Sequence, residues 1–139
     1  MDLLARREHT RWELRRKLEV RGLASEMIDP VLDKLASEGL QSDARFAESY
    51  VAHRAERGYG PVRVAEELKV RGVESALIRE YVRQADPEWG RRMRAVRTKR
   101  FGAGWPKDAR ERARQSRFLY SRGFTSEQIQ RLMHKGDEF

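Results

Sequence analysis

An internal repeat of about fifty residues constrains the fold of this chain more than any other feature of its sequence. Each copy holds a leucine, a glycine four residues later and an isoleucine six residues after the glycine. An arginine stands directly before each glycine. The copies are separated by 50 and then by 51 residues, and their members are Leu18, Gly22 and Ile28, then Leu68, Gly72 and Ile78, then Leu119, Gly123 and Ile129. Three divergent copies of one unit therefore follow one another along the chain.

Apolar residues within each copy recur at the spacing of an amphipathic helix. Ile28, Val31, Leu32 and Leu35 lie at positions i, i+3, i+4 and i+7, and the pattern returns in the second copy and, shortened, in the third. Each copy reads as helix, turn, helix, glycine, helix. Pro30 is expected to shift the start of its helix or to kink it. The predicted helices cover residues 2–9, 11–20, 25–38, 43–57, 61–71, 75–85, 87–101, 107–121 and 126–135.

The glycines Gly22, Gly72 and Gly123 are predicted to end the second helix of each copy with a positive φ, which only glycine adopts cheaply. A β-carbon there is expected to cost about 1 kcal/mol through left-handed strain. Residues with capping side chains stand at several predicted helix starts, including Thr10, Thr125 and Asp86.

These patterns predict an all-α fold of three tandem three-helix repeats stacked into an elongated, curved helical array. The predicted domain limits are 1–40, 41–85 and 86–139. The composition agrees, because 39% of the residues are hydrophobic, 37% are charged, and no long stretch alternates apolar and polar residues as a strand would.

Positive charge gathers in the third copy. The chain has 30 Lys and Arg residues against 22 Asp and Glu, a formal net charge of +8, and between residues 90 and 122 only Asp108 and Glu111 oppose the basic residues. Such a run favours nucleic-acid phosphates or an acidic protein surface as partner over an ordinary solvated helix face. The candidate contacts are Arg91, Arg94, Arg97, Lys99, Arg110, Arg114, Arg117 and Arg122.

A secondary basic cluster precedes Gly22, where acidic residues interrupt it and make it more like a solvated helix; it consists of Arg11, Arg15, Arg16 and Lys17. Tyr59 and Trp105 are expected in loops, where each either covers a helix end or stacks on a base or a partner's side chain. A helix-turn-helix that reads DNA sequence is disfavoured, because the third helix of each copy exposes mixed or acidic residues.

Residues for catalysis or for holding a metal are not grouped in this sequence. It contains no cysteine, its three histidines are far apart, and it has no glycine-rich phosphate loop. We therefore expect a binding protein rather than an enzyme, with neither a metal nor a cofactor. No secretory signal or membrane-spanning run is evident, so the expected compartment is the cytoplasm.

Ordered short motifs along almost the whole chain resemble the bacterial RecX family of recombination regulators. They are Leu4-Ala5-Arg6-Arg7-Glu8-His9-Thr10, Glu13-Leu14, Lys17-Leu18, Arg21-Gly22, Glu38-Gly39-Leu40, Asp43, Arg45-Phe46-Ala47, Arg57-Gly58-Tyr59-Gly60-Pro61, Glu67-Leu68, Arg71-Gly72-Val73, Arg100-Phe101-Gly102, Arg117-Phe118-Leu119 and Arg122-Gly123-Phe124.

The resemblance implies three tandem three-helix bundles that bind the RecA recombinase, notably its filament on single-stranded DNA. It implies inhibition of RecA's ATP hydrolysis, strand exchange and co-protease function, and hence control of recombination, DNA repair and the SOS response. A monomer is expected, with direct contact to single- or double-stranded DNA as a further partner and no membrane. Two alternatives stay open: a nonspecific basic DNA-binding protein that acts without RecA, and a helical scaffold for another protein.

Overall fold

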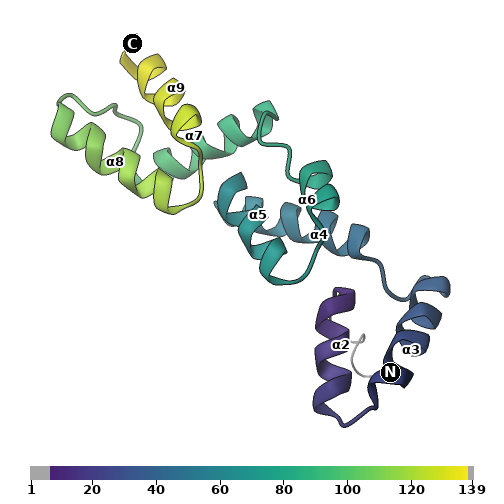
Figure 1. Cartoon of the computed structure of the whole chain (residues 1–139). Helices are drawn as coiled ribbons and strands as arrows, with labels where there is room; N and C mark the ends of the chain where they lie inside the picture. The colour runs from purple at the N-terminus through teal and green to yellow at the C-terminus, as the bar shows by residue number, and fades with distance from the viewer. Residues whose placement is uncertain (1–6, 138–139) are drawn as a thin grey trace. The chain divides into compact units, whose positions relative to one another are not determined.

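The chain is entirely helical over the part that the structure describes. The computed structural model describes residues 7–137, with side chains up to residue 134. Eight α-helices and no strand lie within these residues (Figure 1). They are α2 (Arg11–Val20), α3 (Ser25–Ser37), α4 (Asp43–Glu56), α5 (Pro61–Val70), α6 (Ser75–Tyr81), α7 (Pro87–Phe101), α8 (Ala109–Ser121) and α9 (Ser126–Asp137). The all-α class predicted from the repeat is confirmed.

Four predicted helix boundaries are wrong by two residues or more, and capping residues explain three of them. The fourth is the end of α9, at Asp137 rather than at residue 135. Thr10 has an extended backbone as the N-cap of α2, and residues 7–9 before it are not helical; residues 2–6 of that predicted helix lie outside the described part. Helix α6 ends at Tyr81 rather than at residue 85, because Asp86 caps α7 and precedes Pro87, which disfavours a helical backbone before it. Asp108 caps α8 in the same way, so α8 begins two residues later than predicted.

Pro30 lies inside α3 without ending it. Its side chain is exposed, so the ring meets solvent and not the helix partner. The expected shift of the helix start does not occur, because α3 still begins at Ser25.

The described residues form two compact units. One unit holds the residues up to Tyr50 together with Glu67–Tyr81, and the other holds Val51–Glu66 together with the residues from Val82 on. In the first unit α2 and α3 pack against each other. Their shared core is apolar and consists of the buried Leu14, Ile28, Leu32 and Leu35 with the partly buried Leu18, Leu23 and Val31 around them.

In the second unit α7, α8 and α9 pack against one another. Their buried apolar residues are spaced along one face of each helix and include Trp89, Met93, Leu119, Ile129 and Leu132. Burying each such side chain stabilises the fold by about 1.5–3 kcal/mol, which makes these stripes the main reason that the helices assemble.

The second helix of each copy ends in the same turn, which we call the glycine turn and define as Arg21–Gly22, Arg71–Gly72 and Arg122–Gly123. The φ angles of the three glycines are 88°, 83° and 101°, as the sequence predicts. The amide after each glycine donates to the carbonyl oxygen five residues earlier, which satisfies a helix-end carbonyl. The bonds are Leu23 to Leu18 at 3.1 Å, Val73 to Leu68 at 3.1 Å and Phe124 to Leu119 at 3.3 Å.

Candidate functional site

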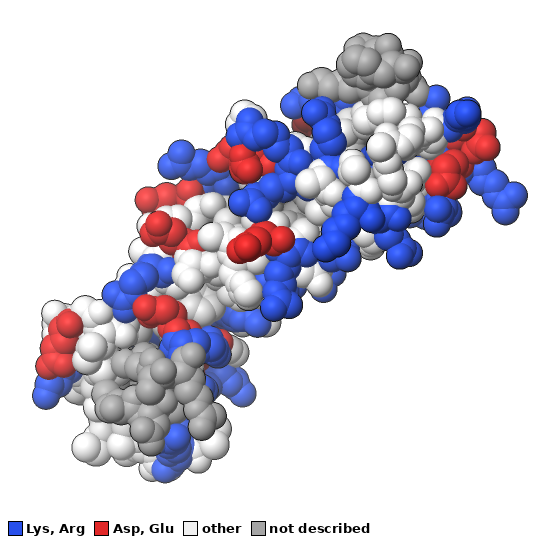
Figure 2. All heavy atoms as spheres, turned by 180° about the vertical axis from the view of Figure 1, so that it is seen from behind, with Lys and Arg blue, Asp and Glu red and all other residues white. Residues whose placement is uncertain are grey.

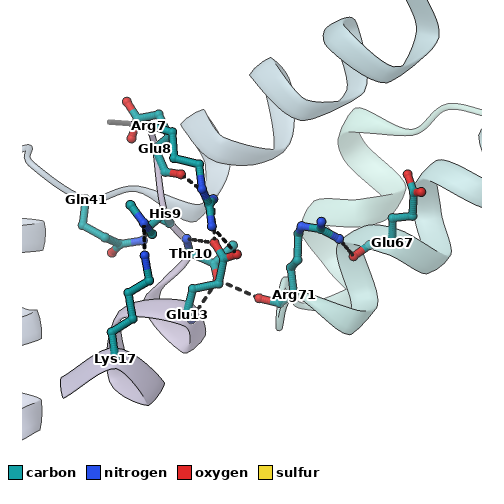
Figure 3. Close-up of polar contacts among 9 residues, drawn as sticks. All are labelled: Arg7, Glu8, His9, Thr10, Glu13, Lys17, Gln41, Glu67 and Arg71. Atoms are coloured by element: carbon teal, nitrogen blue, oxygen red, sulfur yellow. Dashed lines mark hydrogen bonds and ion pairs between the residues drawn. The ribbon is translucent and has the colours of Figure 1, made fainter. Parts of the chain in front are cut away.

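The glycine turn of the second copy lies against the start of α2 (Figure 3). Thr10 Oγ1 accepts the amide hydrogen of Glu13 at 3.1 Å and donates its own hydrogen to the carbonyl oxygen of Arg71 at 2.6 Å. A β-carbon on Gly72 would lie 2.3 Å from the β-carbon of Trp12. The turn therefore approaches α2 more closely than any side chain on residue 72 would allow.

Ion pairing and capping hold the same end of α2. The carboxylate of Glu13 accepts the amide hydrogen of Thr10 at 3.0 Å and a guanidinium hydrogen of Arg7 at 2.9 Å. Burial raises the pKa of Glu13, but the hydrogen bonds from Arg7 and Thr10 outweigh burial and keep this pKa below its ordinary value. The Glu13 carboxylate is therefore charged at neutral pH and keeps its hydrogen bonds at the start of α2.

The glycine turn of the third copy makes the corresponding contact with the start of α5. The amides of Gly60 and Val62 donate to the carbonyl oxygens of Arg122 and Gly123 at 2.8 and 2.9 Å. A β-carbon on Gly123 would lie 2.4 Å from the β-carbon of Arg63. Both turns therefore use backbone carbonyls to satisfy donors at the start of the preceding copy's second helix.

The glycine turn of the first copy is different. A β-carbon on Gly22 would have no heavy atom of the described chain within 4 Å, its own neighbours aside. Gly22, Gly72 and Gly123 are thus equivalent in backbone conformation but not in surroundings.

His9 lies in the interior beside this contact. It is 1% exposed, and its Nε2 is 2.8 Å from the ammonium nitrogen of Lys17 (Figure 3). The ammonium group can only donate, so Nε2 accepts and the ring is neutral. Burial lowers the pKa of His9, and the positive charges of Arg7 and Lys17 lower it further. Lys17 of the secondary basic cluster is therefore occupied within the protein.

The remaining members of the secondary basic cluster are also engaged. Arg11 pairs with Asp29 at 3.2 Å and with Asp33 at 2.9 Å, and Arg15 pairs with Asp29 as well. The hydrogen bond from Arg15, followed by that from Arg11, lowers the pKa of Asp29. Arg16 stacks over the Trp12 ring, 5.0 Å from its centroid. Each member of this cluster thus has a partner within the chain, and two of them, Arg11 and Arg15, are paired with carboxylates.

The basic face of α8 contains the strongest candidate contacts. Arg110, Arg114 and Arg117 are all exposed and follow the i, i+4, i+7 spacing of one helix face. Arg114 pairs with Glu111 at 3.0 Å. Arg110 and Arg117 have no acidic partner within ion-pair distance among the described residues. We call these two residues with Arg94 and Lys99 of α7, which are exposed and likewise lack such a partner, the unpaired basic set.

The other candidates on α7 and α8 are partly engaged. Arg91 is exposed but donates to the carboxylate of Glu88 at 2.8 Å through Nε. Arg122 is half-buried, and its guanidinium lies 5.1 Å from the ring centre of Tyr59 and 5.2 Å from that of Phe118. Arg91 thus already has an acidic partner, and Arg122 takes part in the packing around Tyr59 and Phe118.

Arg97 does not belong to the exposed basic surface, and its inclusion among the surface contacts is wrong. It is only 1% exposed. It donates to Gln115 Oε1 at 3.0 Å and to the carbonyl oxygens of Gly102 and Gly104, and it stacks on the Trp105 ring at 4.1 Å. Arg97 thus ties the loop after α7 to α8, and burial lowers its pKa.

Charges of both signs are mixed on the molecular surface. On the face drawn in Figure 2, basic side chains are interspersed with acidic ones over much of the surface. This face is therefore not uniformly positive, and the pairing of individual side chains identifies the basic residues without acidic partners.

The aromatic candidates have partners within the chain, and a different aromatic side chain is exposed. The guanidinium groups of Arg54 and Arg63 lie 3.9 and 4.4 Å from the ring centre of Tyr59. The guanidinium group of Arg97 lies 4.1 Å from the ring centre of Trp105. Tyr120 on α8 is 67% exposed. Sequence reasoning missed it, although its place directly after the buried Leu119 turns it away from the core stripe.

The described residues contain no group of three or more His, Cys, Asp or Glu side chains that could hold a metal ion. Within the same residues, no helix has the length and apolar character that a membrane span requires. What the geometry offers is a set of exposed arginine and lysine side chains that can bind phosphate or carboxylate groups.

Three family models match this chain in order. The first three-helix domain of RecX matches residues 1–35, the second matches residues 42–82 and the third matches residues 91–133. These matches confirm three three-helix domains, while the precise limits 1–40, 41–85 and 86–139 stay predictions. Regulatory protein RecX of Halorhodospira halophila (strain DSM 244 / SL1) is 52% identical over 138 residues, which are 99% of this chain and 86% of that relative. Its counterpart in Pseudomonas putida (strain F1) is 50% identical over 137 residues, or 99% and 88% of the two chains.

Two solved structures share the fold. The crystal structure of RecX from Lactobacillus salivarius aligns with a TM-score of 0.82 at 18% identity, over 99% of this chain and 92% of that one. A crystal structure of regulatory protein RecX aligns with a TM-score of 0.77 at 22% identity, over 96% and 67% of the two chains.

Proposed function

Because this chain belongs to the RecX family of regulatory proteins, we propose that it binds the RecA recombinase and RecA filaments on single-stranded DNA and inhibits RecA. The inhibited activities are ATP hydrolysis, strand exchange and co-protease function. The protein acts as a monomer in the cytoplasm and thereby modulates recombination, DNA repair and the SOS response. The ordered match of three RecX domains over most of the chain carries this proposal.

The unpaired basic set supplies the charge for this role. RecA filaments present DNA phosphates and protein carboxylates, and exposed arginines bind either group through charge-assisted hydrogen bonds. Among the predicted contacts, the exposed residues without an acidic partner in the described part of the chain are Arg110 and Arg117 on α8 and Arg94 and Lys99 on α7. Arg91, Arg114 and Arg122 stand beside them as secondary contacts, since each already has a partner within the chain.

The test is RecA's DNA-dependent ATPase, followed while this protein is added at substoichiometric ratios. We expect the rate of ATP hydrolysis to fall. Double substitution Arg110→Glu and Arg117→Glu should relieve the inhibition, because both positions then repel the anionic partner. The matched control is Lys34→Glu with Arg79→Glu, which makes the same charge change at exposed positions of α3 and α6. A wild-type protein that leaves the ATPase untouched would reject the proposal.

A nonspecific DNA-binding protein that works without RecA is the second candidate, and the unpaired basic set favours it. Binding to DNA alone should then be as tight as binding to the RecA–DNA filament at the same ionic strength. Equilibrium binding to RecA alone, DNA alone and the filament separates the two functions. Preference for the filament over both separate components supports the RecA regulator.

A further inference from the structure

We propose that Tyr120, Arg117 and Arg110 form a binding surface on α8 for single-stranded nucleic acid, in which the ring of Tyr120 stacks on a base and the two guanidinium groups bind phosphates. This surface goes beyond the proposed regulation of RecA, because it adds Tyr120 to the arginines and makes the surface selective for single strands without needing RecA.

The exposure of Tyr120 is the first observation. Its side chain is 67% exposed, whereas its neighbour Leu119 is completely buried. The other exposed aromatic side chain among the described residues, Trp12, is 43% exposed, carries the Arg16 guanidinium on its ring and lies against the Gly72 turn. The Tyr120 side chain makes no ring contact or hydrogen bond with the described part of the chain, so its faces are open to a planar ligand.

The position of the ring relative to the arginines is the second observation. Arg117 precedes Tyr120 by three residues, so the two side chains are neighbours on the helix surface. Arg110 lies two turns before Arg117 on the same face. At 1.5 Å of rise per residue, the three side chains extend over about 15 Å of the helix. This length suits a short stretch of extended strand better than a single small anion.

The charge of the two arginines is the third observation. The nearby carboxylate of Glu111 is bound to Arg114, through both the Nε and the terminal nitrogen, at 3.0 and 3.1 Å. The hydrogen bonds from Arg114 and Gln115 lower the pKa of Glu111, so this carboxylate stays ionised and occupied. Arg110 and Arg117 therefore remain available for phosphates.

An aromatic ring beside arginines selects single strands over duplex. A base in a duplex has both faces stacked on its neighbours, so it offers no face to Tyr120. Bases of a single strand are open, and proteins commonly hold them by stacking on aromatic side chains beside a positively charged surface that binds the phosphates. Arginines alone would bind both forms through their phosphates.

The experiment measures binding of the intact protein to a labelled oligo-dT and to a hairpin duplex of equal length by fluorescence anisotropy at one salt concentration. Tyr120→Ala should weaken binding to oligo-dT by about 5- to 150-fold and leave binding to the hairpin nearly unchanged. Tyr120→Phe keeps the ring and should keep the affinity. Arg110→Gln with Arg117→Gln should weaken binding to both ligands.

Controls make the result decisive. Met27→Ala truncates a side chain that is 57% exposed on α3 and should change neither affinity. Equal losses for both ligands in Tyr120→Ala, or no binding of oligo-dT by the wild type at low salt, would overturn the proposal. So would an equal loss for polyglutamate, because the surface would then recognise acidic polymers in general. The anisotropy measurements contain no RecA, and the ATPase test of the wild-type protein does not involve Tyr120, so failure of the binding surface and failure of RecA inhibition are visible separately.

Discussion

The three repeat glycines show how one residue type serves different purposes at equivalent positions. Each has a positive φ that strains any other residue, which accounts for the motif in all three copies. Gly72 and Gly123 also permit close approach to Trp12 and Arg63, whereas Gly22 has open space around its missing β-carbon. The positive φ accounts for the need for glycine at all three positions, whereas close packing adds a second reason at Gly72 and Gly123 only.

Substitution of these glycines by alanine should separate the two effects. Gly22→Ala should lower the free energy of unfolding by about 1–2 kcal/mol, the cost of the left-handed backbone alone. Gly72→Ala should cost about 2–4 kcal/mol, because the added methyl group also overlaps Trp12. Gly123→Ala should cost at least as much, since its methyl group also meets the backbone nitrogen of Arg63 at 2.8 Å, which cannot rotate away. Urea unfolding followed by circular dichroism measures all three, and equal losses would contradict the role of packing.

His9 gives the first unit a dependence on pH. Burial and the charges of Arg7 and Lys17 keep its pKa below the ordinary value of 6.5, so the unfolded chain binds this proton more readily than the folded chain does. Stability is therefore fully present above pH 6.5 and falls as the pH drops toward the folded-state pKa. Between pH 7.5 and 5.5 the loss from this group can reach at most about 1.4 kcal/mol, the value for a histidine that takes up its proton only in the unfolded chain.

Urea unfolding at a series of pH values tests this expectation. His9→Gln should flatten the pH dependence over that interval, although it also removes the contact with Lys17 and lowers the overall stability. His53→Gln changes an exposed histidine of α4 and serves as the control, with the slope retained. A wild-type profile without slope between pH 7.5 and 5.5 would show that His9 does not titrate differently on folding.

At the scale of elements, periodicity located the helices and capping decided their limits. Helix α2 over Arg11–Val20 and α7 over Pro87–Phe101 coincide with the predicted ranges, because each has both an apolar stripe and a clear N-cap. The end of α6 could not be predicted from its apolar ladder, since Val82 is buried without being helical. The non-helical segment after α6 continues the apolar spacing of the helix, because Val82 packs in the core although it is not part of α6.

The position of Arg97 was missed for a related reason. Trp89, Met93 and Arg97 follow one another at intervals of four residues, so Arg97 continues the buried stripe of α7. A charged residue is ordinarily assigned to the surface. Only the structure shows the carbonyl oxygens and the amide of Gln115 that satisfy its guanidinium in the interior.

Substitution of the buried Arg97 should therefore change the free energy of unfolding rather than the affinity for an anionic partner. Arg97→Met keeps the volume but leaves the carbonyl oxygens of Gly102 and Gly104 without their donor, and we expect a loss of about 2–4 kcal/mol in the free energy of unfolding. Arg94→Met, on the exposed side of the same helix, should change it by less than about 0.5 kcal/mol. Thermal unfolding by circular dichroism compares the two variants. Equal stability of both would contradict the structural role of Arg97.

At the scale of the whole molecule, the net charge of +8 is less informative than the distribution of its pairs. Arg11, Arg15 and Lys17 in the first copy are engaged by neighbours, while the unpaired basic set lies on α7 and α8 of the third. The composition favours an anionic partner, which stays a prediction, and the run of arginines indicates the copy that carries the excess of positive charge. An arginine is available to a partner only if no carboxylate of the chain already pairs with it. These pairs depend on the three-dimensional positions of the side chains, which a single sequence does not give.

The salt dependence of binding to single-stranded DNA should count these available charges. If all four members of the unpaired basic set displace counterions from phosphates, the logarithm of the association constant should fall with the logarithm of salt concentration with a slope of about −3. Arg110→Gln with Arg117→Gln removes two of the four contacts and should reduce the slope to about −1.4. Lys34→Gln with Arg79→Gln removes the same charge from α3 and α6 and should leave the slope at its wild-type value. If both double variants reduced the slope equally, net charge rather than the faces of α7 and α8 would determine binding, and the unpaired basic set would lose its special role.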